Sequence, residues 1–203
     1  MIKAVIFDMG GVLVNLDKGR CIESFRRIGF PEFASLLDLW HQKGILSDFE
    51  EGKIGEEEFV SRCFDMCANK ITAQQIKDSL NSLCTGIPKE KADFVKELAG
   101  KYPLYALSNN NPFCAAEFER EGEEVGLIFR ESFKDLFYSF RMKLLKPSKE
   151  IYQEVVRRIG LPAEELLFID DSAANVEAAT SVGMKAVLYE PGTSLRDFVN
   201  SYL

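Results

Sequence analysis

Six polar residues of the chain follow apolar segments typical of buried strands: Asp8, Ser108, Asn109, Lys146, Asp170 and Asp171. The segments span 2–7, 103–107, 137–140 and 166–169. If they form a parallel sheet, their carboxyl ends lie at one edge, and the polar side chains meet in one crevice. Carboxylates suit a divalent cation such as Mg²⁺, whereas ammonium, hydroxyl and amide groups suit a phosphoryl group. The combination predicts metal-assisted phosphoryl transfer.

Within such a site each residue type has a chemical role. Asp8 is the candidate nucleophile, which would attack phosphorus and form an aspartyl-phosphate that water hydrolyses. Asp8 and Asp171 would supply oxygen ligands to Mg²⁺. Lys146 would place a positive charge on the transferring group, as both a catalytic and a substrate-binding residue. Ser108, with neighbouring amide groups such as Asn109, would hydrogen-bond the remaining phosphate oxygens.

Each residue also has a purely structural interpretation. Asp8, Ser108 or Asp171 could cap a turn or a helix, and Lys146 could be a solvated loop lysine. Asn175 could be a polar residue in the first turn of a helix. Their convergence on one sheet edge favours a site over these interpretations.

Strand and helix patterns alternate along most of the chain. A fifth apolar segment lies at 185–189, and helical spacing is found at 88–98, 113–122, 148–159, 172–182 and 194–199. This order predicts an α/β fold, a Rossmann-like, doubly wound parallel sheet joined by crossover helices.

One long segment, 15–87, interrupts the alternation. It has no strand pattern and shows helical spacing at 21–28, 32–41, 55–67 and 72–83, with Thr72 as a candidate N-cap. We therefore expect an α-helical cap at 15–87, inserted into a core formed by 1–14 and 88–203. Such a cap would control access to the site.

Composition narrows the function classes. The 203 residues carry a formal charge of −7 with no basic run of five, which argues against nucleic acid and anionic membranes as partners. A small phosphorylated molecule is the expected partner, and the composition carries no signal for a particular oligomeric state. With no leader pattern and no 18-residue apolar run, a cytoplasmic location is expected.

The polar groups and their flanking residues resemble, in order, the four motifs of the haloacid dehalogenase (HAD) superfamily of hydrolases. The matching segments are Phe7-Asp8-Met9-Gly10-Gly11-Val12-Leu13, Leu107-Ser108-Asn109, Lys146-Pro147, and Phe168-Ile169-Asp170-Asp171-Ser172 with Asn175. The resemblance implies a HAD-like core with a helical cap and Mg²⁺ held by Asp8, the Gly10 carbonyl and Asp171, with Asp170 and Asn175 supporting. Within the family, the pattern is similar to bacterial sugar phosphatases of the α-D-glucose-1-phosphate phosphatase type.

The chain departs from most family phosphatases at Gly10, where they carry a second aspartate that protonates the leaving oxygen. Loss of a general acid typically costs about 10²–10⁴ in rate. The enzyme would then be slow, take an acid from the cap, or use a substrate whose leaving group needs less help, such as a hexose-1-phosphate. His41, the single histidine, is the candidate substitute. Further candidate cap contacts are Arg20, Trp40 and Lys43.

Two alternatives stay open at this point. A non-catalytic, phosphate-binding regulatory protein would explain Gly10 as a mark of lost catalysis. A metal-independent haloacid dehalogenase also lacks the second aspartate, but the acidic pair Asp170-Asp171 would be a liability there without a cation.

Overall fold

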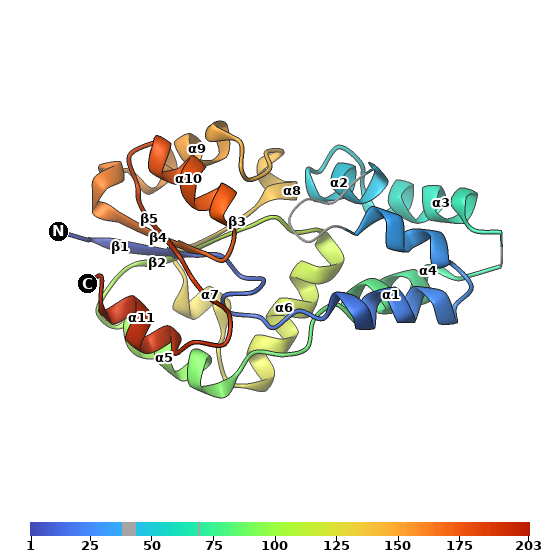
Figure 1. Cartoon of the computed structure of the whole chain (residues 1–203), viewed down its shortest axis with the longest axis horizontal. Helices are drawn as coiled ribbons and strands as arrows, with labels where there is room; N and C mark the ends of the chain where they lie inside the picture. The colour runs from blue at the N-terminus through green and yellow to red at the C-terminus, as the bar shows by residue number, and fades with distance from the viewer. Residues whose placement is uncertain (38–43, 69) are drawn as a thin grey trace.

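A parallel five-stranded sheet forms the centre of the computed structural model, which describes residues 1–37, 44–68 and 70–203. The strand order is β3-β2-β1-β4-β5, with helices on both faces (Figure 1). The strands are β1 Ala4–Phe7, β2 Leu104–Ser108, β3 Asp135–Tyr138, β4 Leu166–Asp170 and β5 Lys185–Leu188. This confirms the predicted doubly wound fold.

Strand β1 occupies the middle of the sheet and is buried along its whole length. Its side chains alternate between the two faces, as strand geometry requires. Val5 and Phe7 belong to one buried cluster, and Ala4 and Ile6 belong to the other. The sheet therefore separates two apolar layers, and β1 delivers Asp8 to its carboxyl edge.

Helices of the core cover both layers. They are α5 Lys89–Ala99, α6 Pro112–Glu124, α7 Phe129–Ser132, α8 Ser139–Met142, α9 Lys149–Ile159, α10 Ala173–Ser181 and α11 Leu195–Asn200, with a 3₁₀ turn, η2, at Ala163–Glu165. Helices α5, α7 and α11 pack on the Phe7 side, and α9 and α10 pack on the Ile6 side (Figure 1).

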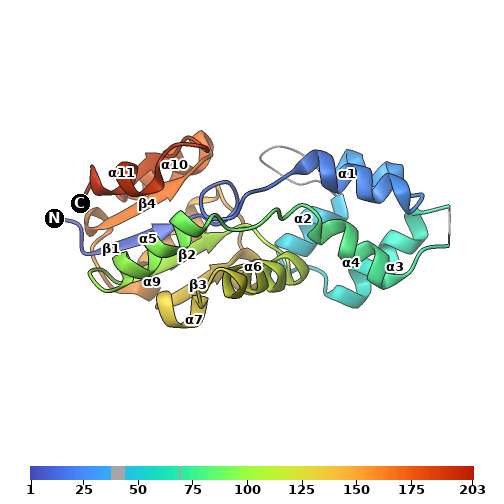
Figure 2. The ribbon, with the colours of Figure 1, turned by 90° about the horizontal axis from the view of Figure 1, so that it is seen from below.

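The segment between β1 and α5 is helical throughout its described elements. These are α1 Lys18–Arg27, the 3₁₀ helix η1 Pro31–Leu36, α2 Gly44–Glu50, α3 Glu56–Met66 and α4 Ala73–Asn81. They lie beyond the carboxyl end of the sheet (Figures 1 and 2). This placement suits a cap over the strand ends, and the division into a cap at 15–87 and a core at 1–14 and 88–203 stays a prediction.

Aromatic side chains connect the helical segment to the core. Phe49 of α2 stacks on Phe59 of α3 with ring centroids 4.3 Å apart, and Phe113 of α6 meets Phe49 edge-on at 5.2 Å. All three rings belong to the apolar cluster that also contains Phe7. Burial of one shared cluster therefore fixes α2 beside the strand ends.

The sequence predicts the start of one helix correctly and is wrong about two elements. Thr72 caps α4 with a capping box that includes Gln75, as its position predicted. The predicted strand 137–140 is wrong in its limits, since β3 ends at Tyr138 and Ser139 begins α8. The predicted helix 32–41 is a 3₁₀ turn over its described part, where the Ser35 hydroxyl donates to the Glu32 carbonyl.

The sequence analysis predicts no helix at α2, because seven residues beginning with glycine give too short a periodic pattern. In the described parts of the chain, each helix is too short or too polar to cross a lipid bilayer.

Candidate active site

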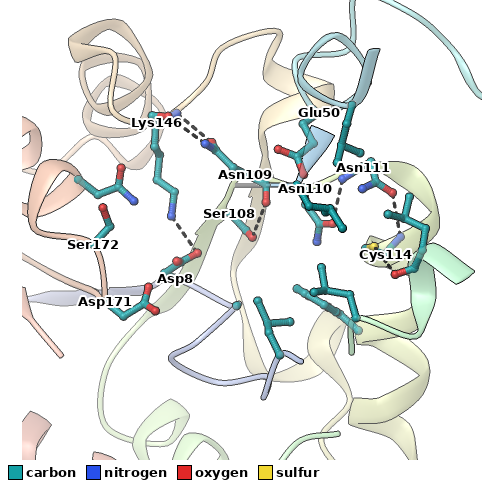
Figure 3. Close-up of a pocket in the computed structure, with 18 residues that line it drawn as sticks. Asp8, Glu50, Ser108, Asn109, Asn110, Asn111, Cys114, Lys146, Asp171 and Ser172 are labelled. Carbon is teal, nitrogen blue, oxygen red and sulfur yellow. Dashed lines mark hydrogen bonds and ion pairs between the residues drawn. The ribbon is translucent and has the colours of Figure 1, made fainter. Parts of the chain in front are cut away.

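A cavity of about 140 Å³ lies at the carboxyl edge of the sheet, beneath the helical segment (Figure 3). Its polar lining includes predicted site residues from the ends of three different strands, the loop before α9 and the first turn of α10: Asp8, Gly10, Ser108, Asn109, Lys146, Asp171 and Asn175. Asp170, the remaining predicted residue, is fully buried beneath them. The topology thus brings together residues up to 167 positions apart in the chain, from Asp8 to Asn175.

Lys146 is the electrostatic centre of this cluster. Its Nζ lies 2.8 Å from Asp8 Oδ1 and 2.8 Å from Asp170 Oδ2, and it donates to the Leu107 carbonyl at 3.1 Å. Burial lowers the pKa of Lys146, but the carboxylates of Asp170 and Asp8 outweigh it and hold that pKa above its ordinary value. Lys146 therefore stays charged beside the candidate nucleophile.

Asp170 serves Lys146 and the start of α10. Its Oδ1 accepts from the Ser172 N–H at 2.8 Å and from Asn175 Nδ2 at 2.9 Å, while Oδ2 receives Lys146. These bonds satisfy a carboxylate that has no access to solvent. Asp170 thus holds Lys146 in place and is itself held by Asn175, and the supporting roles of both residues in the reaction stay a prediction.

Asn109 fixes the backbone at Lys146 from the opposite side. Its Nδ2 donates to the Lys146 carbonyl at 2.9 Å, and its Oδ1 accepts from the Lys146 N–H at 2.8 Å. Both polar side-chain atoms of Asn109 are thus engaged with the backbone of Lys146. Ser108 is buried beside it, with its hydroxyl toward the cavity (Figure 3).

Three carboxyl groups suit a divalent cation at this site. Asp8, Asp170 and Asp171 each offer an oxygen, and the three oxygens lie within 4.8 Å of one another. Three carboxylates against one ammonium leave two uncompensated negative charges, which one Mg²⁺ would neutralise. Oxygen donors of this kind are those that Mg²⁺ prefers. Asp8 and Asp171 face the cavity, so they fit the ligand roles, whereas Asp170 is committed to Lys146.

Burial and the excess of negative charge raise the pKa values of Asp8 and Asp171. Burial, followed by the neighbouring carboxylates, raises the pKa of Asp8 to about 7 against the pull of Lys146. Burial and Asp170 raise the pKa of Asp171 to about 6. A bound cation would favour the ionised forms of both groups.

These pKa shifts predict an unusual pH dependence of stability. From about pH 4 to about pH 7 the folded, metal-free protein holds the Asp8 and Asp171 protons more tightly than the unfolded chain, so its free energy of unfolding falls as the pH rises. Adding Mg²⁺ at neutral pH is expected to recover the loss. Urea unfolding at several pH values, with a chelator or with Mg²⁺, measures both effects. A free energy that rises over this range without metal would contradict the prediction, as would indifference to Mg²⁺.

Gly11 allows Asp171 to approach the first loop. Its φ is +80°, and a Cβ built there would lie 2.1 Å from Asp171 Oδ2. The positive φ and the close approach both require glycine at this position. The loop after β1 therefore determines where the candidate metal ligand can sit.

Gly11→Ala is expected to displace Asp171 and to lower Mg²⁺-dependent turnover roughly 10–100-fold, since misplaced ligands or their supports weaken metal sites by about that factor. The measurement is the Mg²⁺ concentration for half-maximal activity. Gly192→Ala is the matched control, because Gly192 also has a positive φ, +94°, but has open space around its Cβ position. Equal losses in the two variants would mean that backbone strain, rather than Asp171, explains the effect.

Two cavity residues were missed as site residues. Glu50 ends α2, and burial raises the pKa of its carboxyl to about 8, with Lys146 opposing. Asn110 is buried next to Asn109, and its Nδ2 is a buried donor without a partner among the described residues. Asn110 could have been found by its place after a strand, whereas no sequence pattern connects Glu50 to the core.

Apart from Asn111 and Ser172, the remaining wall of the cavity is apolar. It is formed by Leu16, Leu37, Leu46, Leu80, Leu83, Cys114 and Phe118, most of them from the helical segment or its connections. Of the predicted cap contacts, Arg20 lines a separate surface cavity with Asp78 and Glu117. The candidates Trp40, His41 and Lys43 lie outside the described residues.

Comparison with known proteins agrees with this geometry. The family model of haloacid dehalogenase-like hydrolases matches residues 2–183. D-ribitol-5-phosphate phosphatase from Bacteroides thetaiotaomicron is 30% identical over 201 residues, covering 97% of this chain and 96% of that protein. A phosphorylated carbohydrates phosphatase from Thermotoga maritima is 28% identical over 201 residues, covering 91% of this chain and 83% of its own length.

A crystal structure of a HAD family enzyme from Bacteroides thetaiotaomicron, in complex with magnesium and inorganic phosphate, superposes with a TM-score of 0.87. It is 32% identical, and the match covers 95% of this chain and 96% of that one. Together with the matched motifs and the parallel sheet, these findings show that the chain belongs to the haloacid dehalogenase-like hydrolase family.

Proposed function

We propose that this hydrolase is a Mg²⁺-dependent phosphatase that cleaves a small phosphorylated carbohydrate through an aspartyl-phosphate on Asp8. The observation that carries the proposal is Lys146, a buried ammonium 2.8 Å from both Asp8 and Asp170 at the floor of the cavity. The named phosphatases among the relatives and the structure with magnesium and phosphate support it.

The two oxygens of Asp8 are differently placed for this reaction. Oδ1 accepts from the Met9 N–H at 2.7 Å and pairs with Lys146. Within the described residues Oδ2 has no such partner, and we assign it the attack on phosphorus. The attack forms an Oδ2–P bond, the ester P–O bond breaks, and water then cleaves the aspartyl-phosphate to inorganic phosphate and restores the carboxylate.

Other residues of the cavity bind and neutralise the phosphoryl group. Lys146 supplies positive charge, and the Ser108 hydroxyl supplies a hydrogen bond, both in a site shielded from water. Asp8, the Gly10 carbonyl and Asp171 would hold Mg²⁺, which when bound stabilises the negative charge of the phosphoryl group. These roles are the ones that the four motifs imply.

Substrate size and chemistry follow from the cavity wall and the relatives. A cavity of about 140 Å³ with one polar and one apolar side suits a small phosphate ester. A pentitol 5-phosphate, by analogy with D-ribitol-5-phosphate phosphatase, and a hexose-1-phosphate are the two candidates. They differ in the leaving oxygen, which is a primary alkoxide in the first and a more acidic hemiacetal oxygen in the second.

The experiment is a phosphate-release screen with the purified protein, with Mg²⁺ or with a chelator, over pentitol phosphates, hexose-1-phosphates, hexose-6-phosphates and nucleotides. We expect Mg²⁺-dependent release from one of the carbohydrate classes. Phosphate binding without turnover would instead support the regulatory alternative that Gly10 raises. Metal-independent release of halide from a 2-haloacid would support a dehalogenase. We also propose that the binding partner is a small phosphorylated molecule and that the protein is cytoplasmic.

A further inference from the structure

Glu50 is an acidic group in the proposed active site for which the motifs give no role. It comes from α2 of the helical segment rather than from a strand end, and its side chain lines the same cavity as Asp8 and Lys146. Figure 3 shows it entering the cavity from the α2 side. The position that lacks an acid, Gly10, lines this cavity too.

We propose that Glu50 is the general acid of the reaction, which protonates the leaving oxygen of the substrate in place of a side chain at residue 10. This inference rests on the proposed phosphatase function. It assigns the role to a residue of the helical segment rather than to the loop after β1.

The backbone of Glu50 is held against the core. Its carbonyl accepts from the Ser139 hydroxyl at 2.6 Å, and the same hydroxyl accepts from the Asn110 N–H at 2.9 Å. Ser139 is fully buried at the start of α8. One side chain thus connects the end of α2 to the loop that directly follows Ser108 at the end of β2.

The turn after Glu50 also packs closely against the core. Gly52 has a φ of +68°, and a Cβ built there would lie 2.1 Å from the Phe140 carbonyl oxygen. Only glycine permits this approach, so the segment that follows Glu50 packs directly on α8. The position of Glu50 over the cavity is therefore fixed by contacts with the core, as a catalytic group requires.

The surroundings of the carboxyl suit an acid at neutral pH. Within the described residues it has no hydrogen-bond or ion-pair partner, and Lys146 is the charged group that acts on it. Glu50 is half-buried, and the desolvation of its carboxyl raises the pKa to about 8, so the group keeps its proton at neutral pH. The unpartnered Asn110 Nδ2 lines the same cavity and could donate to an oxygen of the substrate beside it.

The proton balance closes over the two steps. When Asp8 attacks phosphorus, the electron pair of the breaking P–O bond goes to the leaving oxygen, which takes the proton of Glu50 and departs as an alcohol. Glu50 is then a carboxylate, and it takes a proton from the water that attacks the aspartyl-phosphate. The second step restores the protonated acid and the free Asp8 carboxylate.

The test compares Glu50→Gln with the wild type on two substrates: the best carbohydrate phosphate from the screen, and p-nitrophenyl phosphate, whose leaving phenolate needs no proton. We expect the single-turnover rate of leaving-group release to fall by about 10²–10⁴ on the carbohydrate phosphate and by less than about tenfold on p-nitrophenyl phosphate, because this step precedes the water attack that both substrates share. Because Glu50 loses its proton above about pH 8, the wild type should lose activity on the carbohydrate phosphate at alkaline pH. Glu50→Gln should not show this loss.

Glu51→Gln is the matched control, because Glu51 is the adjacent residue, pairs with Lys53 and does not line the cavity. It should keep wild-type activity on both substrates. Equal losses on both substrates in Glu50→Gln, or no loss on either, would overturn the role of Glu50 while leaving the phosphatase intact. A wild type that hydrolyses neither substrate would overturn the proposed function itself.

Discussion

Lys146→Met is expected to lower the free energy of unfolding by about 3–5 kcal/mol, the usual cost of removing one partner from a buried ion pair. The variant leaves Asp8 and Asp170 facing each other without the ammonium that lies 2.8 Å from each. Methionine is unbranched and only one atom shorter than lysine, so most of the loss reports the charge rather than a cavity. Urea unfolding at neutral pH measures it, and activity should be lost in the same variant.

Two further variants make this result specific. Lys89→Met makes the same substitution in an exposed ion pair with Asp93 and should lower the free energy of unfolding by less than about 1 kcal/mol. Adding Asp170→Asn to Lys146→Met should recover part of the lost stability, because it removes one of the two stranded charges. A loss in Lys146→Met no larger than in Lys89→Met would mean that Lys146 does not organise the acidic cluster.

Asp8→Asn is expected to lower kcat by about 10⁴-fold or more, as removal of a catalytic nucleophile does in other hydrolases. The amide has the same shape but cannot form the acyl phosphate. The fold should survive, since the carboxyl of Asp8 is buried at a cost in free energy that its raised pKa reflects. Steady-state kinetics with Mg²⁺ and far-ultraviolet circular dichroism together make the measurement.

Asp93→Asn is the control for this substitution, because Asp93 lies on the exposed face of α5 and takes no part in the cavity. It should retain full activity. If Asp8→Asn kept more than about a tenth of the wild-type kcat, a cost of only about 1.4 kcal/mol in the barrier, Asp8 would not be the nucleophile.

The residues that sequence reasoning placed correctly share one property. Asp8 and Ser108 lie where their strands end, and Asp171 directly follows its strand, so the topology of a parallel sheet is sufficient to bring them together. Lys146 lies further from its strand, yet it reaches the same edge through its bonds to Asn109. Local patterns and one rule of topology were therefore enough for these four residues.

Glu50 could not be predicted, because its position depends on contacts between distant parts of the chain. It reaches the cavity through the Ser139 hydroxyl and the close packing of Gly52 on Phe140. Ser139 and Phe140 were themselves read as the end of a strand, whereas they begin α8. Predicting which cap side chains reach the site thus requires the three-dimensional structure, since no periodicity in the sequence shows how α2 packs against the core.

The central claim is that phosphoryl transfer proceeds through Asp8 rather than directly to water. The most direct test is the stereochemical course at phosphorus, with a thiophosphate ester made chiral by an oxygen isotope and hydrolysed in water that carries a second isotope. Two successive in-line displacements, first by Asp8 and then by water, predict net retention of configuration at phosphorus. Net inversion would show a single displacement by water and would contradict the aspartyl-phosphate.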